Sequence, residues 1–388
     1  MKLNNIRYVG VNDHALDLFE GQYPVPNGMA YNSYIILDEK IAVMDSVSVE
    51  FAEEWISKIR RELGDRSPDY LIVQHMEPDH SGSILHFMEA YPEVKIVASA
   101  RAFDMIKNFF GISFGEKKLV VGDGDTLSLG KRELSFISAM MVHWPEVIMT
   151  YDDEEKVLFS ADAFGSFGAL DVETEDWACE ARRYYIGIVG KYGAAVQPVL
   201  KKIAALDVQT ICSLHGPVLS EDVGKYIELY HIWSSFLPEE EGVMIAYTSI
   251  YGNTQKAALL LAEKLREKGQ AVVVYDLARS DVFAAVADAF RYSKLVLATT
   301  TYNGNIFPAM SEFLYHLTER GYHNRTVGFI ENGSWAPVAL RWMKKRLEKC
   351  NGLRYLQNEV SILSALNESS MAQLMALVEE LCGDNAEK

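Results

Sequence analysis

The chain has 388 residues, 49% of them hydrophobic, and a formal net charge of −17. This length and composition favour two domains with substantial cores and disfavour disorder. The acidic balance disfavours nucleic acid and anionic membrane surfaces as partners, because both attract clustered Lys and Arg. No apolar run approaches the ~18 residues that span a bilayer, and the first residues lack the apolar core of a signal peptide. We therefore expect a cytoplasmic protein.

The first half of the chain mixes short apolar runs with amphipathic stretches. The apolar runs predict strands at Ser33–Leu37, Ile41–Met44, Tyr70–Val73, Lys95–Val97, Leu134–Ile137 and Lys156–Ser160. Helical periodicity predicts helices near Glu50–Leu63, Ser83–Ala90 and Glu221–Phe236. This order of elements predicts an α/β layered domain with two sheets.

One loop in this half contains four potential metal ligands within six residues. His75, Glu77, Asp79 and His80 follow a predicted buried strand and precede a predicted helix. Loops at the carboxyl ends of strands are where α/β domains place their ligands. Crowded carboxylates and imidazoles are costly to bury unless a cation compensates them. The loop therefore predicts a metal site.

Three further candidate ligands follow later apolar runs in the same manner. His143, Asp162 and His215 are each a polar residue after such a run and beside a loop-forming residue. None of the four cysteines belongs to a C-x-x-C pair, so thiolate zinc, rubredoxin-type iron and iron–sulfur clusters lack their ligands. His86 fits an amphipathic helix and is assigned a structural role. The remaining histidines show no partners in the sequence.

The segment Leu237–Gly242, with its Pro, acidic run and Gly, is the best candidate for a linker. We place the domain boundary between residues 240 and 241. Beyond the linker, apolar runs predict strands at Val243–Thr248, Ala271–Tyr275, Leu295–Thr301, Thr326–Ile330 and Glu359–Leu363. Helical patterns such as Gln255–Lys268 separate these runs. Continuous apolar strands alternating with helices predict a doubly wound parallel five-stranded sheet of the flavodoxin-like kind.

The loop after the first of these strands is suited to a single phosphate. Ser249, Ile250, Tyr251, Gly252, Asn253 and Thr254 offer hydroxyl, amide and backbone N–H donors just before a helix. The sequence has neither G-x-G-x-x-G for a dinucleotide nor a Walker lysine for ATP. Alone, such a cluster is as readily explained as a helix N-cap.

Two later loops make a flavin the better explanation. Each follows a predicted strand and combines an aromatic residue with glycine and small polar neighbours. Tyr302 and Trp335 offer faces for a planar isoalloxazine ring, and the glycines allow backbone donors to approach it. The predicted flavin-binding residues of these loops are Thr301, Tyr302, Asn303, Gly304, Asn305, Asn332, Gly333, Ser334, Trp335 and Ala336. Three loops that agree in position and chemistry predict FMN.

Together, these motifs resemble those of the flavo-diiron proteins, in which a metallo-β-lactamase-like αβ/βα sandwich precedes a flavodoxin-like domain. The pattern H-x-E-x-D-H carries Glu77 where the hydrolases of that fold have a second His. A carboxylate in place of an imidazole makes the site harder and more anionic, which favours iron over zinc. The resemblance covers the whole chain, with residues 1–240 as the metallo-β-lactamase-like diiron domain and residues 241–388 as the flavodoxin-like FMN-binding domain.

The resemblance implies a role for each candidate ligand. His75, Glu77 and His143 would hold one iron, Asp79, His80 and His215 a second iron, and Asp162 would bridge the pair. FMN would pass electrons to this site, which would reduce dioxygen to water, nitric oxide to nitrous oxide, or both. Tyr192 matches a position that the family places near the diiron pocket, and its role is left open between catalysis and structure.

The resemblance also implies partners. The electron donor would be rubredoxin or a similar carrier, with a reductase or a reduced deazaflavin as alternatives. A head-to-tail homodimer, or a dimer of dimers, is implied as well. Two rival interpretations remain: a zinc-dependent hydrolase of the metallo-β-lactamase fold fused to a flavodoxin, and an electron carrier with an inactive first domain. Glu77 counts against the first, and the complete ligand set counts against the second.

Overall fold

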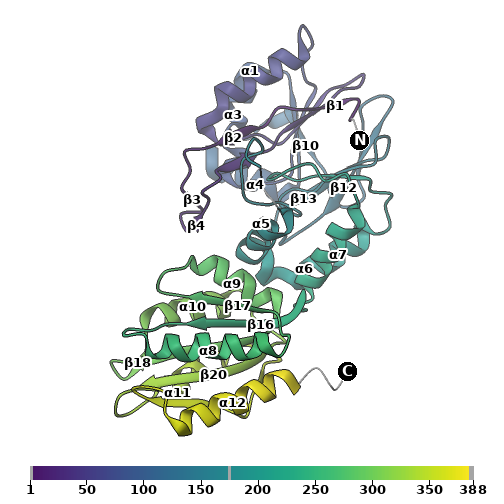
Figure 1. Ribbon diagram of the computed structural model, residues 1–388. Coiled ribbons are helices and arrows are strands. Elements are labelled where there is room, and N and C mark those ends of the chain that lie inside the picture. Colours follow the sequence, from purple (N-terminus) through teal and green to yellow (C-terminus); the bar gives the residue numbers. More distant parts are fainter. Residues whose placement is uncertain (1–2, 174–175, 384–388) are drawn as a thin grey trace. The chain divides into compact units, whose positions relative to one another are not determined.

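The computed structural model describes residues 3–173 and 176–383, which form two compact units, Met1–Ser234 and Ser235–Lys388 (Figure 1). Each unit has its own sheets and core. Part of the predicted linker is strand, because Glu240–Gly242 open β16. None of the helices in the described ranges is long and apolar enough to cross a membrane.

Unit 1 contains two main sheets. The six-stranded sheet has the order β1-β6-β7-β8-β9-β10, and the five-stranded sheet has the order β11-β12-β13-β14-β15. The first sheet comprises β1 (Ile6–Tyr8), β6 (Tyr34–Ile36), β7 (Ala42–Met44), β8 (Tyr70–Val73), β9 (Lys95–Ala98) and β10 (Lys118–Val120). The second comprises β11 (Thr126–Ser128), β12 (Glu133–Ser138), β13 (Ile148–Asp152), β14 (Val157–Phe159) and β15 (Thr210–Cys212).

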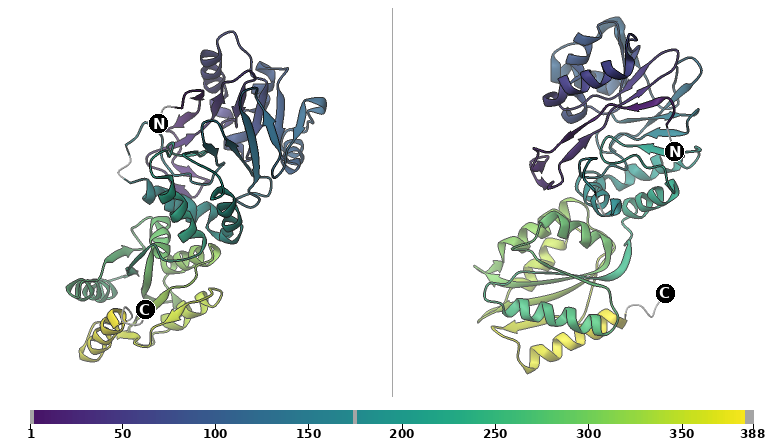
Figure 2. Two further views of the ribbon diagram at one scale, coloured as in Figure 1. Left: turned by 90° about the vertical axis from the view of Figure 1, so that its right-hand side faces the viewer. Right: turned by 45° about the horizontal axis from the view of Figure 1, so that its top comes forward.

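Apolar side chains of both sheets form one core between them. Ile72 and Val97 of the first sheet share a buried cluster with Phe136 and Phe159 of the second. The helices α1 (Ala52–Leu63), α3 (Ile84–Ala90) and α4 (Ala100–Phe110) lie on one side of the unit, and α5 (Trp177–Tyr184), α6 (Gly193–Ile203) and α7 (Val223–Ser234) on the other (Figures 1 and 2). This is the αβ/βα sandwich expected from the sequence.

Several short elements of unit 1 are absent from the predictions. Two small hairpin sheets pair β2 (Val11–Asp13) with β5 (Met29–Tyr31) and β3 (Leu18–Phe19) with β4 (Tyr23–Pro24). β1, β10, β11, β13 and β15 were also not predicted as strands. Most of these strands have three residues or fewer, too short for an alternating pattern to stand out from loop sequence.

Unit 2 is built on a parallel sheet in the order β17-β16-β18-β20, with β22 beside the end of β20. This is the order of a flavodoxin-like doubly wound fold. Its strands are β16 (Glu240–Tyr247), β17 (Val272–Asp276), β18 (Tyr292–Tyr302), β20 (Thr326–Gly333), β21 (Arg354–Tyr355) and β22 (Val360–Leu363). The short β19 (Asn305–Ile306) turns back along β18. All five predicted strands are present, shifted by a few residues at their ends.

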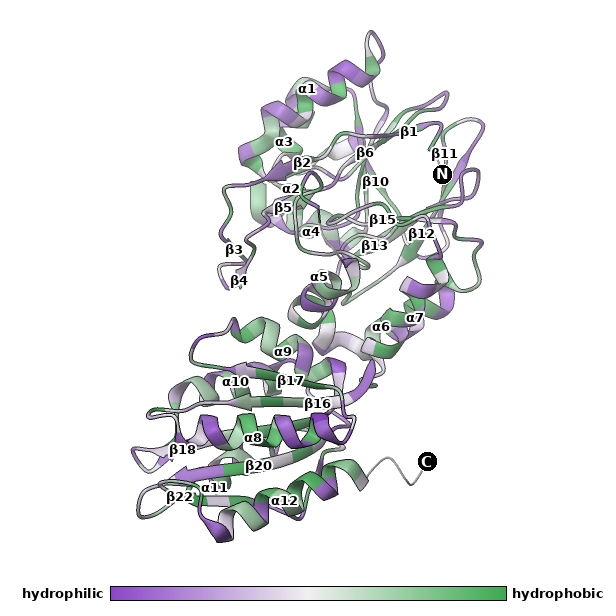
Figure 3. Ribbon diagram, in the orientation of Figure 1, coloured by the Kyte–Doolittle hydropathy of each residue, from purple (hydrophilic) through white to green (hydrophobic). Residues whose placement is uncertain are grey.

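Helices cover both faces of this sheet. α8 (Asn253–Glu267) packs with α12 (Glu368–Gly383), whereas α9 (Val282–Arg291) and α11 (Ala339–Leu347) each pack with α10 (Pro308–Glu319). Figure 3 shows α8 with both hydrophobic and hydrophilic residues along its length. Its apolar side chains, among them Leu261 and Leu265, are fully buried against the sheet. The parallel arrangement brings the carboxyl ends of β16, β18 and β20 to one edge.

Candidate functional sites: a carboxylate–histidine cluster and a flavin-sized cavity

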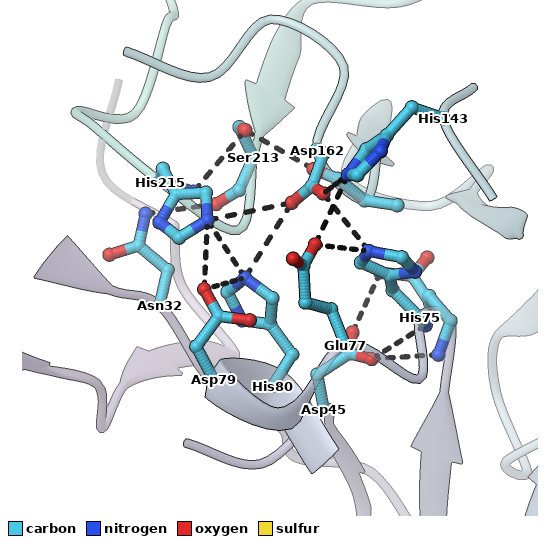
Figure 4. A network of polar contacts seen from close by, with 12 residues as sticks. Asn32, Asp45, His75, Glu77, Asp79, His80, His143, Asp162, Ser213 and His215 are labelled. Carbon is cyan, nitrogen blue, oxygen red and sulfur yellow. Dashed lines mark hydrogen bonds and ion pairs between the residues drawn. The ribbon is translucent and has the colours of Figure 1, made fainter. Parts of the chain in front are cut away.

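Strand ends of both sheets of unit 1 position the seven candidate ligands. His75 and Glu77 lie in the loop after β8, and Asp79 and His80 lie in the short helix α2 (Pro78–Ser81). Pro78 suits the first position of that helix because its missing N–H would have no partner there. The remaining three follow β12, β14 and β15, and they are His143, Asp162 and His215. Figure 4 shows all seven side chains converging on one place.

Four of the seven side chains form a first group. The Nε2 atom of His75 lies 3.1 Å from Glu77 Oε2 and 3.1 Å from Asp162 Oδ2. His143 Nε2 lies at the same two distances, 3.1 Å and 3.1 Å, from the same two oxygens. One ligand atom from each of the four residues lies within 4.8 Å of the others.

The other three side chains form a second group. Asp79 Oδ2 lies 3.3 Å from His80 Nε2 and 3.4 Å from His215 Nε2. The two imidazole Nε2 atoms are 2.9 Å apart. Asp162 joins the groups, because its Oδ1 lies 3.5 Å from His80 Nε2 and 3.6 Å from His215 Nε2 while its Oδ2 faces the first group. The arrangement is one of two adjacent sites with Asp162 between them (Figure 4).

Contacts behind the cluster decide which nitrogen of each histidine faces it. His75 Nδ1 lies 2.9 Å from Glu146 Oε1, and His215 Nδ1 lies 2.8 Å from the backbone oxygen of Ala30. Carboxylate and carbonyl oxygens only accept hydrogen bonds, so Nδ1 carries the proton in both rings. In its neutral form, each ring therefore presents the lone pair of Nε2 to the cluster, as a metal ligand does.

Sequence reasoning missed Glu146, whose Oε1 also accepts the backbone N–H of Met76 at 2.9 Å. Its side chain is fully buried. The only indication in the sequence was that Glu146 follows the candidate ligand His143 by three residues.

Without a cation, the cluster is electrostatically unsatisfied. Neither oxygen of Asp79 has a hydrogen-bond partner among the described residues, and the same is true of Asp162 Oδ1. The Nε2 atoms of His80 and His215 face each other at 2.9 Å, so a proton or a metal ion must lie between their lone pairs. Buried, unpaired carboxylates cost several kcal/mol each. The nitrogen and oxygen donors of this set fit hard or borderline transition-metal ions.

The pKa values of the cluster agree with a demand for positive charge. Burial would lower the pKa of His143, but Asp162 and Glu77 raise it to about 9. The pKa of His75 is also raised well above its ordinary value, since Asp162 outweighs the effect of burial. Burial would raise the pKa of Glu77, yet the two histidines lower it to about 2. Protons thus occupy, in the metal-free protein, the place suited to a metal.

Aromatic rings surround the second group. His215 packs against Phe19, Tyr31 and Tyr184 with ring centroids 5.4, 6.0 and 5.3 Å apart. The Tyr184 side chain is fully buried, and its hydroxyl has no hydrogen-bond partner in the described part of the chain. Burial and the nearby charge of Asp162 raise its pKa well above the ordinary value. The hydroxyl is therefore protonated at neutral pH.

The geometry gives no support to the predicted role of Tyr192. This residue ends a short 3-10 segment, Gly190–Tyr192, and caps the start of α6. Within the described residues, no hydrogen bond or ring contact joins Tyr192 to the cluster. Tyr184, eight residues earlier, is the tyrosine that contacts a candidate ligand. Sequence reasoning missed Tyr184, and no helix was predicted where α5 lies.

In unit 2, the predicted flavin loops enclose a cavity of about 590 Å³. This volume is typical of a small-molecule or cofactor site. The cavity is lined by Ser249, Ile250, Tyr251, Asn253, Thr254, Thr300, Thr301, Tyr302, Asn303, Gly304, Asn332, Gly333, Ser334, Trp335, Ala336, Val338 and Ser364. The sequence did not predict Thr300, Val338 or Ser364, and the predicted Gly252 and Asn305 are not in the lining.

The first loop leads into α8 and supplies uncharged donors. Gly252 has a φ of 87°, which a side chain would strain, and its N–H donates to Ser249 Oγ at 3.1 Å. α8 then begins at Asn253. None of the lining residues of the described cavity carries a charge. A phosphate would therefore be held by hydroxyls, backbone N–H groups and the helix dipole.

Hydrogen bonds tie the three flavin loops to one another. Thr301 Oγ1 accepts the backbone N–H groups of Val338 and Ala339 at 2.9 and 3.2 Å. Asn332 Nδ2 donates to Thr254 Oγ1 at 3.3 Å. The cavity is thus built in advance of any ligand, with two large aromatic side chains, Tyr251 and Trp335, 91% and 88% exposed beside it.

Comparisons with known proteins agree with both parts of this description. Residues 29–216 match the family described as ODP family beta lactamase, and residues 244–352 match a flavodoxin domain. Fold and sites therefore define a two-domain flavoprotein, in which a metallo-β-lactamase-like domain precedes a flavodoxin domain.

The similar proteins define the family more narrowly. The chain is 30% identical over 357 residues to an anaerobic nitric oxide reductase flavorubredoxin of Salmonella paratyphi B, covering 89% of this chain and 74% of that protein. A flavodiiron protein of Giardia intestinalis is 26% identical, with a TM-score of 0.90 over 99% of this chain and 97% of that chain. The rubredoxin oxygen:oxidoreductase of Desulfovibrio gigas, 24% identical, shares the fold with a TM-score of 0.91 over 99% and 98% of the two chains. This chain belongs to the flavodiiron family and is an oxidoreductase.

Proposed function

We propose that unit 2 holds FMN, that the seven-residue cluster holds two iron ions, and that the protein reduces dioxygen or nitric oxide. The observation that carries this proposal is the position of Asp162, with one oxygen toward each group of ligands. A single metal would need only one of these oxygens, whereas two adjacent metals would share the carboxylate. Iron is favoured over zinc because Glu77 stands where the hydrolases have an imidazole.

The division of the ligands follows the two groups. His75, Glu77 and His143 would hold the first iron, Asp79, His80 and His215 the second, and Asp162 would bridge them. FMN supplies electrons, and an iron pair supplies the place where a diatomic gas is reduced. The zinc hydrolase alternative is not favoured, because two of the similar proteins are named as a nitric oxide reductase and an oxygen:oxidoreductase.

The residues around the cluster give it apolar surroundings, which suit a small apolar gas. The rings of Phe19, Tyr31 and Tyr184 lie against His215 and make the surroundings of the second group apolar. Reduction of either gas consumes protons. The protonated hydroxyl of Tyr184, which has no partner among the described residues and whose ring contacts His215, is our candidate for a proton donor.

The family suggests a donor and an assembly for this chain. We propose a rubredoxin-like carrier as the electron donor, in keeping with the name of the Desulfovibrio gigas protein. We also propose a head-to-tail homodimer, alone or in a dimer of dimers. It is supported by the exposed rings of Tyr251 and Trp335, which both line the flavin cavity, since aromatic residues are enriched at interfaces.

The function is tested by mixing the reduced protein with each gas under anaerobic control and following reoxidation of the flavin by absorbance. We expect fast reoxidation by dioxygen, nitric oxide or both, and a loss of at least ~10-fold in His80→Ala, which removes a proposed ligand. The matched control is His86→Ala, because His86 lies in α3 outside the cluster. Equal rates in the two variants would contradict the proposal.

A further inference from the structure

Helix α11 carries a concentration of positive charge in a strongly acidic chain. Residues 339–354 contain six Lys or Arg and one Glu, whereas the whole chain has a net charge of −17. We define the α11 basic patch as the four exposed cations Arg341, Lys345, Arg346 and Lys349. At 100° per residue, Arg341, Lys345 and Arg346 lie within about 140° of one another on α11, and Lys349 follows just after the helix ends at Leu347.

The structure of the helix does not account for this charge. Cations in the last turn of a helix interact favourably with the negative end of the helix dipole, which accounts for the positions of Lys345 and Arg346. Arg341 lies in the first turn, where a cation is unfavourable and no acidic residue is present. Within the described residues, no carboxylate lies within 4 Å of any of the four cations, whereas the neighbouring Lys344 pairs with Glu359. The patch is therefore available to an external anion.

The α11 basic patch lies beside the flavin cavity. Arg341 and Lys345 lie over the ring of Trp342, 5.3 and 5.0 Å from its centroid. The indole N–H of Trp342 donates to the backbone oxygen of Gly304 at 2.9 Å, and Gly304 lines the cavity. Val338, which precedes the helix, lines it too. Figure 1 shows α11 next to β18 and β20, whose ends carry two of the flavin loops.

We propose that the α11 basic patch is the docking surface for a small acidic electron-carrier protein, and this inference rests on the function proposed above. An acidic carrier is repelled by the net charge of the chain but attracted at short range by four unpaired cations. This attraction steers it to the side of unit 2 where electrons can reach the flavin. Each encounter oxidises the carrier by one electron, so two encounters and two protons from water reduce one flavin.

The experiment follows flavin reduction in the full-length protein by anaerobic stopped flow, with reduced rubredoxin as the probe. The test variant is Arg341→Glu/Lys345→Glu. We expect its bimolecular rate constant to fall about tenfold or more at low salt and its salt dependence to flatten, as with the loss of electrostatic steering. Arg341→Gln/Lys345→Gln should give an intermediate loss. Because a Glu in the first turn interacts favourably with the positive end of the helix dipole, the substitution at position 341 should not unfold α11.

The matched control is Lys264→Glu/Lys268→Glu, which changes the net charge equally. These residues lie near the far end of α8, about 17 to 22 Å along the helix from the flavin loop. The control should retain nearly the native rate with rubredoxin. All variants should be reduced equally fast by photoreduced 5-deazariboflavin, a small neutral reductant that needs no docking.

Equal losses in the test and control variants, or no loss in either, would overturn the docking surface. A loss with 5-deazariboflavin as well would also overturn it, because the substitutions would then have damaged the flavin site. The measurement involves neither gas nor iron. A patch-dependent rate in a protein that fails to reduce dioxygen or nitric oxide would therefore support the docking surface and refute the proposed function.

Discussion

At the scale of single residues, the tautomers of two histidines are fixed by groups outside the ligand set. Glu146 accepts the Nδ1–H of His75, and the Ala30 carbonyl accepts that of His215. Such partners typically change metal affinity 10- to 100-fold.

We predict that Glu146→Gln weakens metal binding about 10- to 100-fold, because its amide can present an N–H to His75 in place of an acceptor. The measurement is a competition titration with a chelator, read by metal content, so it is independent of turnover. FMN content should not change. An affinity equal to that of the native protein would show that Glu146 does not set the tautomer.

The raised histidine pKa values predict proton release on metal binding. At pH 7 His143, with a pKa of about 9, is protonated in the metal-free protein, and so is His75. Both must lose a proton to bind metal. Loading the apoprotein with Fe(II) in weak buffer should therefore release more than one proton per chain, measured with an indicator dye. No release would mean that the histidines do not ligate the metal.

The same shift sets the sign of a stability change in the metal-free protein. The pKa of His143 is higher in the folded state than the ~6.5 of an unfolded histidine, so its contribution is fully present below pH ~6.5. That contribution is lost as pH rises through about 9. Chemical denaturation of the apoprotein between these pH values should show falling stability, and His143→Ala should reduce the slope.

The sequence predicted the seven clustered residues because each follows an apolar run, where a polar side chain is conspicuous. Glu146 and Tyr184 were not predicted, because their roles depend on contacts with residues that are distant in the sequence. Tyr192 was chosen from the family pattern and its role stays a prediction, whereas Tyr184 contacts His215. Contacts between residues far apart in sequence have no signature in local pattern.

At the scale of elements, the flavin site depends on three loops held at one edge of a parallel sheet. The alternation of apolar strands and helices was sufficient to predict this sheet, since buried parallel strands are long and continuously apolar. Short hairpin strands such as β3 and β4 have no such pattern and were missed.

We predict that Asn253→Asp weakens FMN binding about tenfold or more. The new carboxylate would lie at the start of α8, in a lining without cations, and would repel the phosphate. The measurement is fluorescence titration of the apoprotein with FMN. Asn305→Asp serves as the control, because Asn305 is not in the cavity lining. This variant should bind FMN nearly as tightly as the native protein does. Equal losses in both variants would argue against a phosphate at the α8 loop.

At the scale of the whole molecule, the proposed function requires electron transfer between a site in unit 2 and a site in unit 1. The proposed homodimer predicts that two inactive variants can complement each other. A variant without flavin and a variant without iron should regain part of the activity after their subunits exchange. Gas consumption measures the recovery, and mass spectrometry of the intact complexes verifies the exchange. Exchange without any recovered activity would exclude electron transfer between the two chains.

The central claim is that the cluster of unit 1 holds a pair of irons, and metal analysis of the purified protein tests it most directly. Iron, zinc and extracted flavin should be measured together on the native protein and on His75→Ala. The account predicts two irons and one FMN per chain in the native protein, and loss of iron with retention of FMN in the variant. Zinc in place of iron, or a variant that keeps its full iron content, would contradict it.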